Sequence, residues 1–347
     1  MPRGTSTALS AAASSSASQR ADEVFLQTLL MACAGLPVAE PPDDLDFWWR
    51  SDGDYTFVLM QGFKVAKDGS GKPVKRGYPS GDYPRRIMLE LVTTAANTKS
   101  RMIYLPPVTT LMRRMGIKVS GGEETGSLPR FREQFERLVD SSIAVISNGD
   151  PSTTAKLVVP IAESFKLWVN RKEPRPAGYK EYVLLSQGFF NHVVRHHIPL
   201  DPVAIDKFGG RGFALKMDIY TWLLYRLHFL TEARLFDWEQ LWSQFGLQLA
   251  DTRQGRSTFR KKIMTGIETV LAEMPQYREH VLVDQAVGVT IIPLLENRLA
   301  LASGPYSVLP EDFELTVDST TSNEASPTGP EVPPGSAVPP QQPGPRL

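Results

Sequence analysis

A run of basic residues between positions 253 and 262 is the feature of this 347-residue sequence that best suits a chemical task. It contains five cations and no acid: Arg253, Arg256, Arg260, Lys261 and Lys262. Long cationic side chains and short hydroxyls on one helix can reach phosphates and guanine edges in the major groove of DNA. Cations at a helix N-terminus oppose the helix dipole, so a helix that begins here favours an anionic partner. The run therefore predicts a DNA-binding helix.

The orientation of this helix follows from the spacing of its apolar residues. Phe259 begins an apolar stripe with helical period and is predicted to point inward. At about 100° per residue, Lys261 and Thr265 then face the opposite way, and Gln254 and Thr258 share that side. We expect the outward residues to read base edges and the flanking cations to hold phosphates. The predicted contacts are Gln254, Arg256, Thr258, Arg260, Lys261, Lys262 and Thr265.

A second group of cations lies in the first half of the chain. Arg130 and Arg137 are predicted to face away from the apolar stripe of an earlier helix, and Arg113 and Arg114 precede that helix. Glu133 lies between the two helical arginines, so the charge of this surface is mixed. Mixed charge suits a supporting phosphate contact or a protein interface better than base reading. The four arginines are therefore predicted as secondary DNA contacts.

Enzymatic chemistry has weaker support. His192 and His196 lie four residues apart, a spacing that can bind metal on a helix, but no third ligand or glutamate base accompanies them in a known pattern. Gly69-Ser70-Gly71-Lys72 lacks the spacing of a phosphate-binding loop, and Cys33 has no adjacent base. We predict a protein without catalytic residues, bound metal or cofactor. The rival from another class is a DNA-nicking enzyme, which would need clustered acids or a tyrosine and histidine metal site.

The elements that position these cations are predicted to occur twice. Residues 82–97 predict a helix, residues 102–105 a strand, and residues 108–115 a short helix that Gly116 ends in a left-handed conformation. A third helix carries the apolar stripe Phe131, Phe135, Val139 and Ile143. Matching residues recur at offsets of 132, 130 and 128, as in Ile87 with Ile219, Ile103 with Leu235, Leu111 with Leu241, and Phe131 with Phe259. The alternative is two unrelated amphipathic regions whose spacing agrees by chance.

This repeated order predicts an α+β chain with two tandem winged-helix domains, at 78–200 and 201–302, and a wing hairpin at 281–292. Residues 21–77 are predicted to form an N-terminal extension, with a helix from Ala21 to Ala34 and a strand from Tyr55 to Phe63. The Ser/Ala-rich residues 1–20 and the Pro-rich tail 303–347 are predicted to be disordered, because neither can bury enough apolar surface to order itself.

Charge and composition agree with a nucleic-acid partner. Residues 76–295 contain 29 Lys/Arg and 22 Asp/Glu, an excess of 7 positive charges, although the whole chain is formally neutral. Such an excess suits a polyanion. The single cysteine suits a reducing compartment, and the apolar run 219–230 is too short to span a bilayer. We expect a cytoplasmic protein that associates with DNA and not with a membrane.

Several short motifs resemble those of RepA-type plasmid replication initiators, in the same order over residues 55–293. They are Tyr78-Pro79-Ser80-Gly81-Asp82-Tyr83-Pro84-Arg85-Arg86, Thr98-Lys99-Ser100-Arg101, Gly121-Gly122, Phe131-Arg132-Glu133-Gln134-Phe135, Asp218-Ile219-Tyr220-Thr221-Trp222-Leu223, Trp238-Glu239-Gln240-Leu241, Phe259-Arg260-Lys261-Lys262 and Ile291-Ile292-Pro293. The resemblance implies a bacterial protein that binds repeated double-stranded sites at a plasmid origin and helps to open that origin. It also implies a dimer–monomer balance, repression of its own gene, and the host replication initiator and helicase as partners. A winged-helix transcriptional repressor is the nearer alternative.

Overall fold

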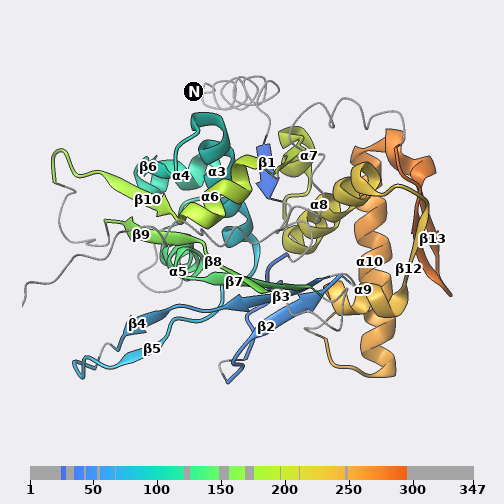
Figure 1. Ribbon diagram of the computed structural model, residues 1–347, viewed down its shortest axis with the longest axis horizontal. Coiled ribbons are helices and arrows are strands. Elements are labelled where there is room, and N and C mark those ends of the chain that lie inside the picture. The colour runs from blue at the N-terminus through green and yellow to red at the C-terminus, as the bar shows by residue number, and fades with distance from the viewer. Residues whose placement is uncertain are drawn as a thin grey trace, which may run out of the picture. The chain divides into compact units, whose positions relative to one another are not determined.

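The computed structural model combines helices and antiparallel strands, which confirms the predicted α+β class (Figure 1). It describes residues 25–28, 35–42, 44–52, 55–66, 68–120, 126–147, 156–168, 176–195, 197–210, 212–246 and 249–294. The two segments predicted to be disordered, 1–20 and 303–347, lie outside these residues.

The first described strand, β1 (Phe25–Thr28), pairs antiparallel with β11 (His197–Leu200). The helix predicted from Ala21 to Ala34 is therefore wrong at residues 25–28. A helical spacing of apolar residues is a local signal, whereas the conformation here is decided by a partner strand far along the chain.

A four-stranded antiparallel sheet has the order β2 (Trp48–Ser51), β3 (Tyr55–Met60), β7 (Ser142–Ser147) and β8 (Lys156–Pro160). One cross-strand row of this sheet is buried, and it consists of Trp48, Leu59, Ile143 and Val159. The hairpin of β4 (Phe63–Val65) and β5 (Pro73–Lys75) follows β3. Residues 21–77 therefore supply strands to the sheets of the first half, so the predicted boundary at residue 78 cuts through the fold.

The first copy of the predicted plan contains α3 (Asp82–Thr98), β6 (Met102–Leu105), α4 (Val108–Arg114), α5 (Ser127–Val139), β9 (Ala162–Lys166) and β10 (Glu181–Leu185). Gly116 has the predicted left-handed conformation, with φ of 70°. Helix α5 ends at Val139, so the prediction that Ile143 extends its apolar stripe is wrong. Ile143 belongs to the β-prone run of β7, where it pairs with Leu59 of β3. Helices α6 (Gln187–Arg195) and α7 (Pro202–Lys207) lead to the second copy.

The second copy contains α8 (Phe213–Phe229), β12 (Arg234–Asp237), α9 (Trp238–Phe245), α10 (Arg253–Glu273), the 3-10 helix η1 (Pro275–His280), β13 (Val281–Asp284) and β14 (Gly288–Ile291). The two copies have matching three-stranded sheets, with orders β6-β10-β9 and β12-β14-β13. Strands β7 and β8 are an insertion in the first copy, between its third helix and its last hairpin. The match of Ile103 with Leu235 is wrong by one residue, because Leu235 is 45% exposed and Phe236 is buried.

Two clusters of buried hydrophobic side chains form the interior. One is built from residues of the first copy and its added strands, and the other from the second copy together with Leu89 of α3 and the elements from β11 to α7. Both clusters lie in one compact unit of the chain. The division into two separate domains therefore stays a prediction.

Candidate nucleic-acid interface

Helix α10 begins at a side-chain cap and is anchored by an aromatic cluster. The hydroxyl of Thr252 accepts a hydrogen bond from the Gly255 amide at 3.0 Å. Phe259 is buried as predicted, and its ring contacts the rings of Trp238 and Trp242 on α9, with centroid distances of 6.4 and 5.2 Å. These edge-on contacts fix the angle between α9 and α10 and so determine which face of α10 is exposed.

The packing of α10 on α8 depends on a glycine. A Cβ atom at Gly266 would lie 2.4 Å from Cδ1 of Ile219, a distance that real side chains do not reach. Only a residue without a side chain therefore allows the two helices to approach this closely. Helix α8 is thus the platform for the predicted DNA-binding helix.

The outward face of α10 carries most of the predicted DNA contacts. Gln254, Arg260, Lys261, Lys262 and Thr265 are exposed, and Thr258 is partly exposed. Among the described residues, no ion pair involves Arg253, Arg260, Lys261 or Lys262. These cations are therefore available to an anion outside the protein.

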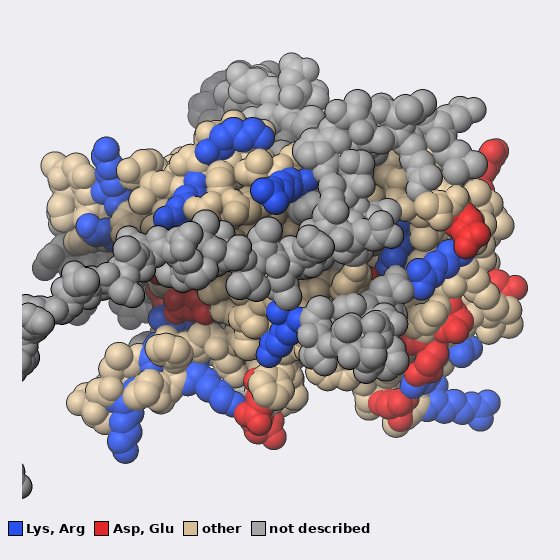
Figure 2. Space-filling model, viewed as in Figure 1, with Lys and Arg blue, Asp and Glu red and all other residues tan. Residues whose placement is uncertain are grey.

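Arg256 has a different environment from its basic neighbours. Its guanidinium donates hydrogen bonds to Asp251, at 2.6 Å for Nε, and to Glu239 on α9. It also lies over the ring of Trp242, 4.2 Å from the ring centre. Hydrogen bonds with Asp251 and then Glu239 raise the pKa of Arg256. Figure 2 shows basic and acidic side chains close together over the region where α9 and α10 lie in Figure 1. The prediction that Arg256 holds a phosphate does not fit this geometry, because two carboxylates already occupy its donors.

The hairpin of β13 and β14 follows η1, as a wing would, but it contributes no positive charge. No Lys or Arg occurs in residues 281–291, and Asp284 lies at the turn. Arg278 in the preceding turn pairs with Glu268 of α10 at 3.1 Å. The hairpin therefore adds no cation to the basic surface of α10.

The corresponding helix of the first copy, α5, is covered by the chain segment that precedes α3. Arg76 forms ion pairs with Glu136 and Asp140. The amide of Ser80 donates a hydrogen bond to Oε1 of Gln134 at 2.7 Å. Gln134, Glu136 and Asp140 are therefore engaged by the preceding segment and are less available to bases than the exposed residues of α10.

Arg137 was predicted to contact DNA, but its position in the structure does not allow this contact. Its side chain is buried, at 8% exposure of the residue, and forms ion pairs with Glu40 and Glu133. It also donates a hydrogen bond to the carbonyl oxygen of Tyr78 at 3.2 Å. The prediction that Arg137 faces outward is wrong, because acceptors from the N-terminal segment draw its guanidinium toward the interior. Its function here is to hold that segment against α5.

The other three arginines of the first copy that were predicted to contact DNA are exposed. Arg113 and Arg130 lie at the surface, on α4 and in the first turn of α5. Arg114 is 59% exposed at its side chain and pairs with Glu90 of α3 at 3.0 Å. Exposed pairs of this kind are weak, so Arg114 can exchange its partner for a phosphate.

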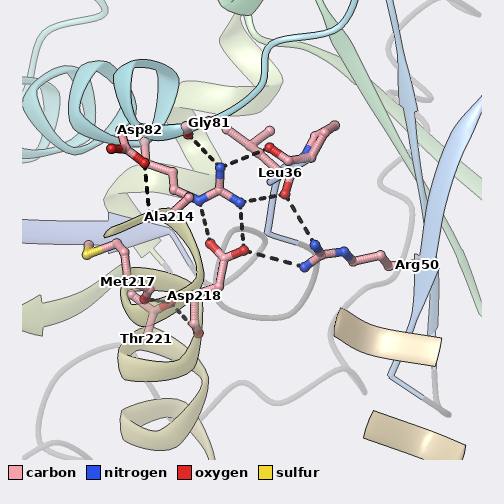
Figure 3. A network of polar contacts seen from close by, with 10 residues as sticks. Leu36, Arg50, Gly81, Asp82, Ala214, Met217, Asp218 and Thr221 are labelled. Atoms are coloured by element: carbon pink, nitrogen blue, oxygen red, sulfur yellow. Dashed lines mark hydrogen bonds and ion pairs between the residues drawn. The ribbon is translucent and has the colours of Figure 1, made fainter. Parts of the chain in front are cut away.

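A buried polar network whose members were not predicted as site residues joins α3 to α8 (Figure 3). Arg85 of α3 pairs with Asp218 of α8, and Arg50 of β2 approaches the same carboxylate at 3.5 Å. Burial lowers the pKa of Arg50 to about 10, although Asp218 opposes this shift. Asp82 accepts a hydrogen bond from the amide of Ala214 at 3.1 Å, at the start of α8. Arg85 and Asp218 lie within the motifs of the family resemblance, which was the only sequence signal for this network.

The described residues also bear on two other kinds of site, a membrane span and a metal centre. Within the described ranges, no helix is both long and apolar enough to cross a bilayer. The His, Cys, Asp and Glu residues of the same ranges form no group of three that could hold a metal ion. His192 is buried in α6, and His197 lies in β11 with Nδ1 2.9 Å from the carbonyl oxygen of Val193.

Comparison with known proteins gives one family match. Residues 78–240 match the family described as plasmid-encoded RepA protein. A crystal structure of RctB domains 2–3 superposes with a TM-score of 0.43 and 9% identity, covering 78% of this chain and 99% of that one. A selenomethionine form of RctB domains 2 and 3 gives a TM-score of 0.42 and 9% identity, covering 76% and 96%. No curated protein sequence gives a significant match.

Proposed function

We propose that this chain initiates plasmid replication by binding double-stranded origin DNA through α10, because residues 78–240 match the family described as plasmid-encoded RepA protein. The observation that carries the proposal is the exposed face of α10. Arg253, Arg260, Lys261 and Lys262 lie there without ion-pair partners among the described residues. Unpaired cations on one helix face supply the electrostatic attraction of a DNA-binding site.

The arrangement of α9, α10 and the sheet β12-β14-β13 supports a winged-helix mode of binding. In that mode α9 lies across the backbone and α10 enters the major groove. Lys261 and Thr265 then face base edges, while Arg260 and Lys262 hold the phosphates on either side. Arg256 maintains the angle between α9 and α10 instead of contacting DNA.

The first copy has a supporting role in this proposal. Its helix α5 is covered by residues 76–80, so Arg113, Arg114 and Arg130 hold phosphates without reading bases. Two tandem winged-helix domains, a dimer–monomer balance, repeated origin sites and recruitment of the host initiator and helicase are further parts of the proposal. The two domains are proposed from the repeated order of elements, and the other parts rest on the family resemblance.

The test uses the full chain and the DNA that flanks its own gene. Binding is measured on fragments of that DNA and on scrambled duplexes at two salt concentrations, and a replicon that lacks the gene is tested for maintenance when the protein is supplied separately. We expect selective, salt-sensitive binding to a flanking site and maintenance only when the protein is present. Selective binding without maintenance would identify a repressor, and binding that ignores sequence would contradict the proposal.

A further inference from the structure

The outer face of the sheet β6-β10-β9 carries aromatic rings and lysines. Tyr104 of β6 pairs in register with Tyr182 of β10, which pairs with Lys166 of β9, so the three side chains form one cross-strand row. Tyr104 is 62% exposed, Lys166 is exposed and Tyr182 is partly exposed. The alternate residues Ile103 and Val183 are buried on the other face of the sheet. The row is therefore a surface feature and does not belong to the hydrophobic core.

Direct contacts extend this row at both ends. The Lys180 ammonium lies over the ring of Tyr104, 5.4 Å from its centre. The Lys166 ammonium lies over the ring of Tyr179 at 4.4 Å, and that ring meets Trp168 edge-on at 5.2 Å. We call these six residues the aromatic-basic face: Tyr104, Lys166, Trp168, Tyr179, Lys180 and Tyr182.

The charge of this face is positive. The three strands contain two acids, Glu163 and Glu181. Glu163 is paired with Arg101 at 2.6 Å, and Glu181 is buried and accepts a hydrogen bond from the amide of Trp168 at 2.7 Å. Figure 2 shows several Lys and Arg side chains over the region where β6, β10 and α6 lie in Figure 1. The local field therefore attracts anions.

The matching sheet of the second copy shows that the fold alone does not produce this face. Its cross-strand row is Leu235, Thr290 and Leu282, which contains neither a ring nor a cation. Asp237 and Asp284 lie further along β12 and β13. Because the two sheets share one strand order, the difference lies in the side chains alone.

We propose that the aromatic-basic face binds single-stranded nucleic acid. Exposed rings on a sheet stack unpaired bases, and neighbouring cations hold the phosphates that connect them. Tyr104 and Tyr182 accept the bases, and Lys166 and Lys180 contact the backbone. A duplex cannot use this face, because its bases are already stacked on one another and offer no free ring surface. The site is distinct from α10, and the proposal goes beyond duplex binding at the origin.

The experiment measures binding of the full chain to fluorescent oligo(dT) and oligo(rU) of roughly 20 nucleotides, a length that exceeds a typical single-strand site. Tyr104→Ala and Tyr182→Ala should each weaken binding by roughly fivefold or more, because each removes one stacking platform. Tyr104→Phe keeps the ring and should bind like the wild type. Lys166→Gln should lower the salt dependence of binding. Leu235→Ala, on the matching sheet, is the control and should change nothing.

The comparison of oligo(dT) with oligo(rU) identifies the source of the strand, since tighter binding of one shows whether the face takes DNA or RNA. The proposal is overturned if the wild type binds neither oligonucleotide. It is also overturned if Tyr104→Ala and Tyr182→Ala bind like the wild type, or if Leu235→Ala weakens binding as much as they do. Duplex binding measured on the same variants should stay unchanged, which separates this site from α10. Tyr104 is exposed, so a melting curve is expected to show that its variants remain folded.

Discussion

Arg85 and Asp218 form a two-point ion pair between α3 and α8, with distances of 2.7 Å from Nε to Oδ1 and 2.6 Å from Nη2 to Oδ2. Both residues are buried, and they lie on the first helices of the two copies. Arg226 and Asp52 form a second buried pair nearby at 3.4 Å. Because α10 packs on α8, these pairs also fix the DNA-binding helix relative to the first copy.

Arg85→Ala should destabilise the protein by roughly 3–5 kcal/mol, because it leaves the buried Asp218 carboxylate without its main partner. The measurement is unfolding by urea, followed by circular dichroism. Lys75→Ala is the matched control, since it breaks the exposed pair with Asp46 and should cost about 0–1 kcal/mol. Equal effects of the two substitutions would show that the buried pair does not hold the copies together.

Gly266→Ala should also destabilise the protein, although alanine normally favours a helix interior by up to about 1 kcal/mol. The added methyl group would collide with Cδ1 of Ile219 and push α10 away from α8. Ile219→Val removes that carbon atom. The double variant should therefore recover part of the melting temperature that Gly266→Ala loses, which a double-mutant cycle measures. Simple addition of the two losses would contradict this account of the helix contact.

Acid should weaken the fold through His228 of α8. Burial lowers the pKa of His228 below its ordinary value of 6.5, and the ring meets Tyr277 edge-on at 6.2 Å. The unfolded chain then binds a proton more readily than the folded one. The contribution of His228 to stability is fully present above pH 6.5 and is lost as the pH falls below it.

His228→Phe replaces the imidazole with an aromatic ring that does not titrate, so its melting temperature should fall less than that of the wild type between about pH 7 and pH 5. Some dependence should remain, because burial also lowers the pKa of His197. If the melting temperatures of the wild type and His228→Phe fall by the same amount across this pH range, the proposed role of His228 is excluded.

The sequence predicted elements whose signals are local. Helix α3 begins at Asp82 as predicted, and α10 begins at Arg253, the first residue of the basic run, because caps and apolar spacing act over a few residues. The strand at 25–28 and the position of Ile143 were missed, because both depend on pairing with distant strands. Arg137 was misplaced for a related reason, since its partners Glu40 and Tyr78 come from a distant segment.

A fragment that begins at residue 55 would lose β1 and β2, so it cannot be expected to fold like the full chain.

The final prediction concerns the helix that reads DNA sequence. Lys261→Ala should cost roughly 1–3 kcal/mol on the cognate duplex and relax discrimination at one base position, because Lys261 is exposed opposite Phe259 on α10. Arg260→Ala should weaken cognate and scrambled duplexes alike and reduce the salt slope by about one, as expected for a phosphate contact. Titrations of both duplexes at two salt concentrations measure these differences.

Two controls separate DNA contact from loss of structure. Phe259→Ala should cost roughly 3–5 kcal/mol of stability, because it removes the ring that contacts both tryptophans of α9. Arg137→Ala should lower stability and leave discrimination between duplexes unchanged, because its guanidinium is buried against Glu40 and Glu133. Arg130→Ala should weaken binding only slightly, because Arg130 is exposed in the first turn of α5 and is proposed to hold one phosphate without reading bases. If Lys261→Ala keeps full affinity and discrimination while Arg130→Ala abolishes both, α5 reads the DNA and α10 does not.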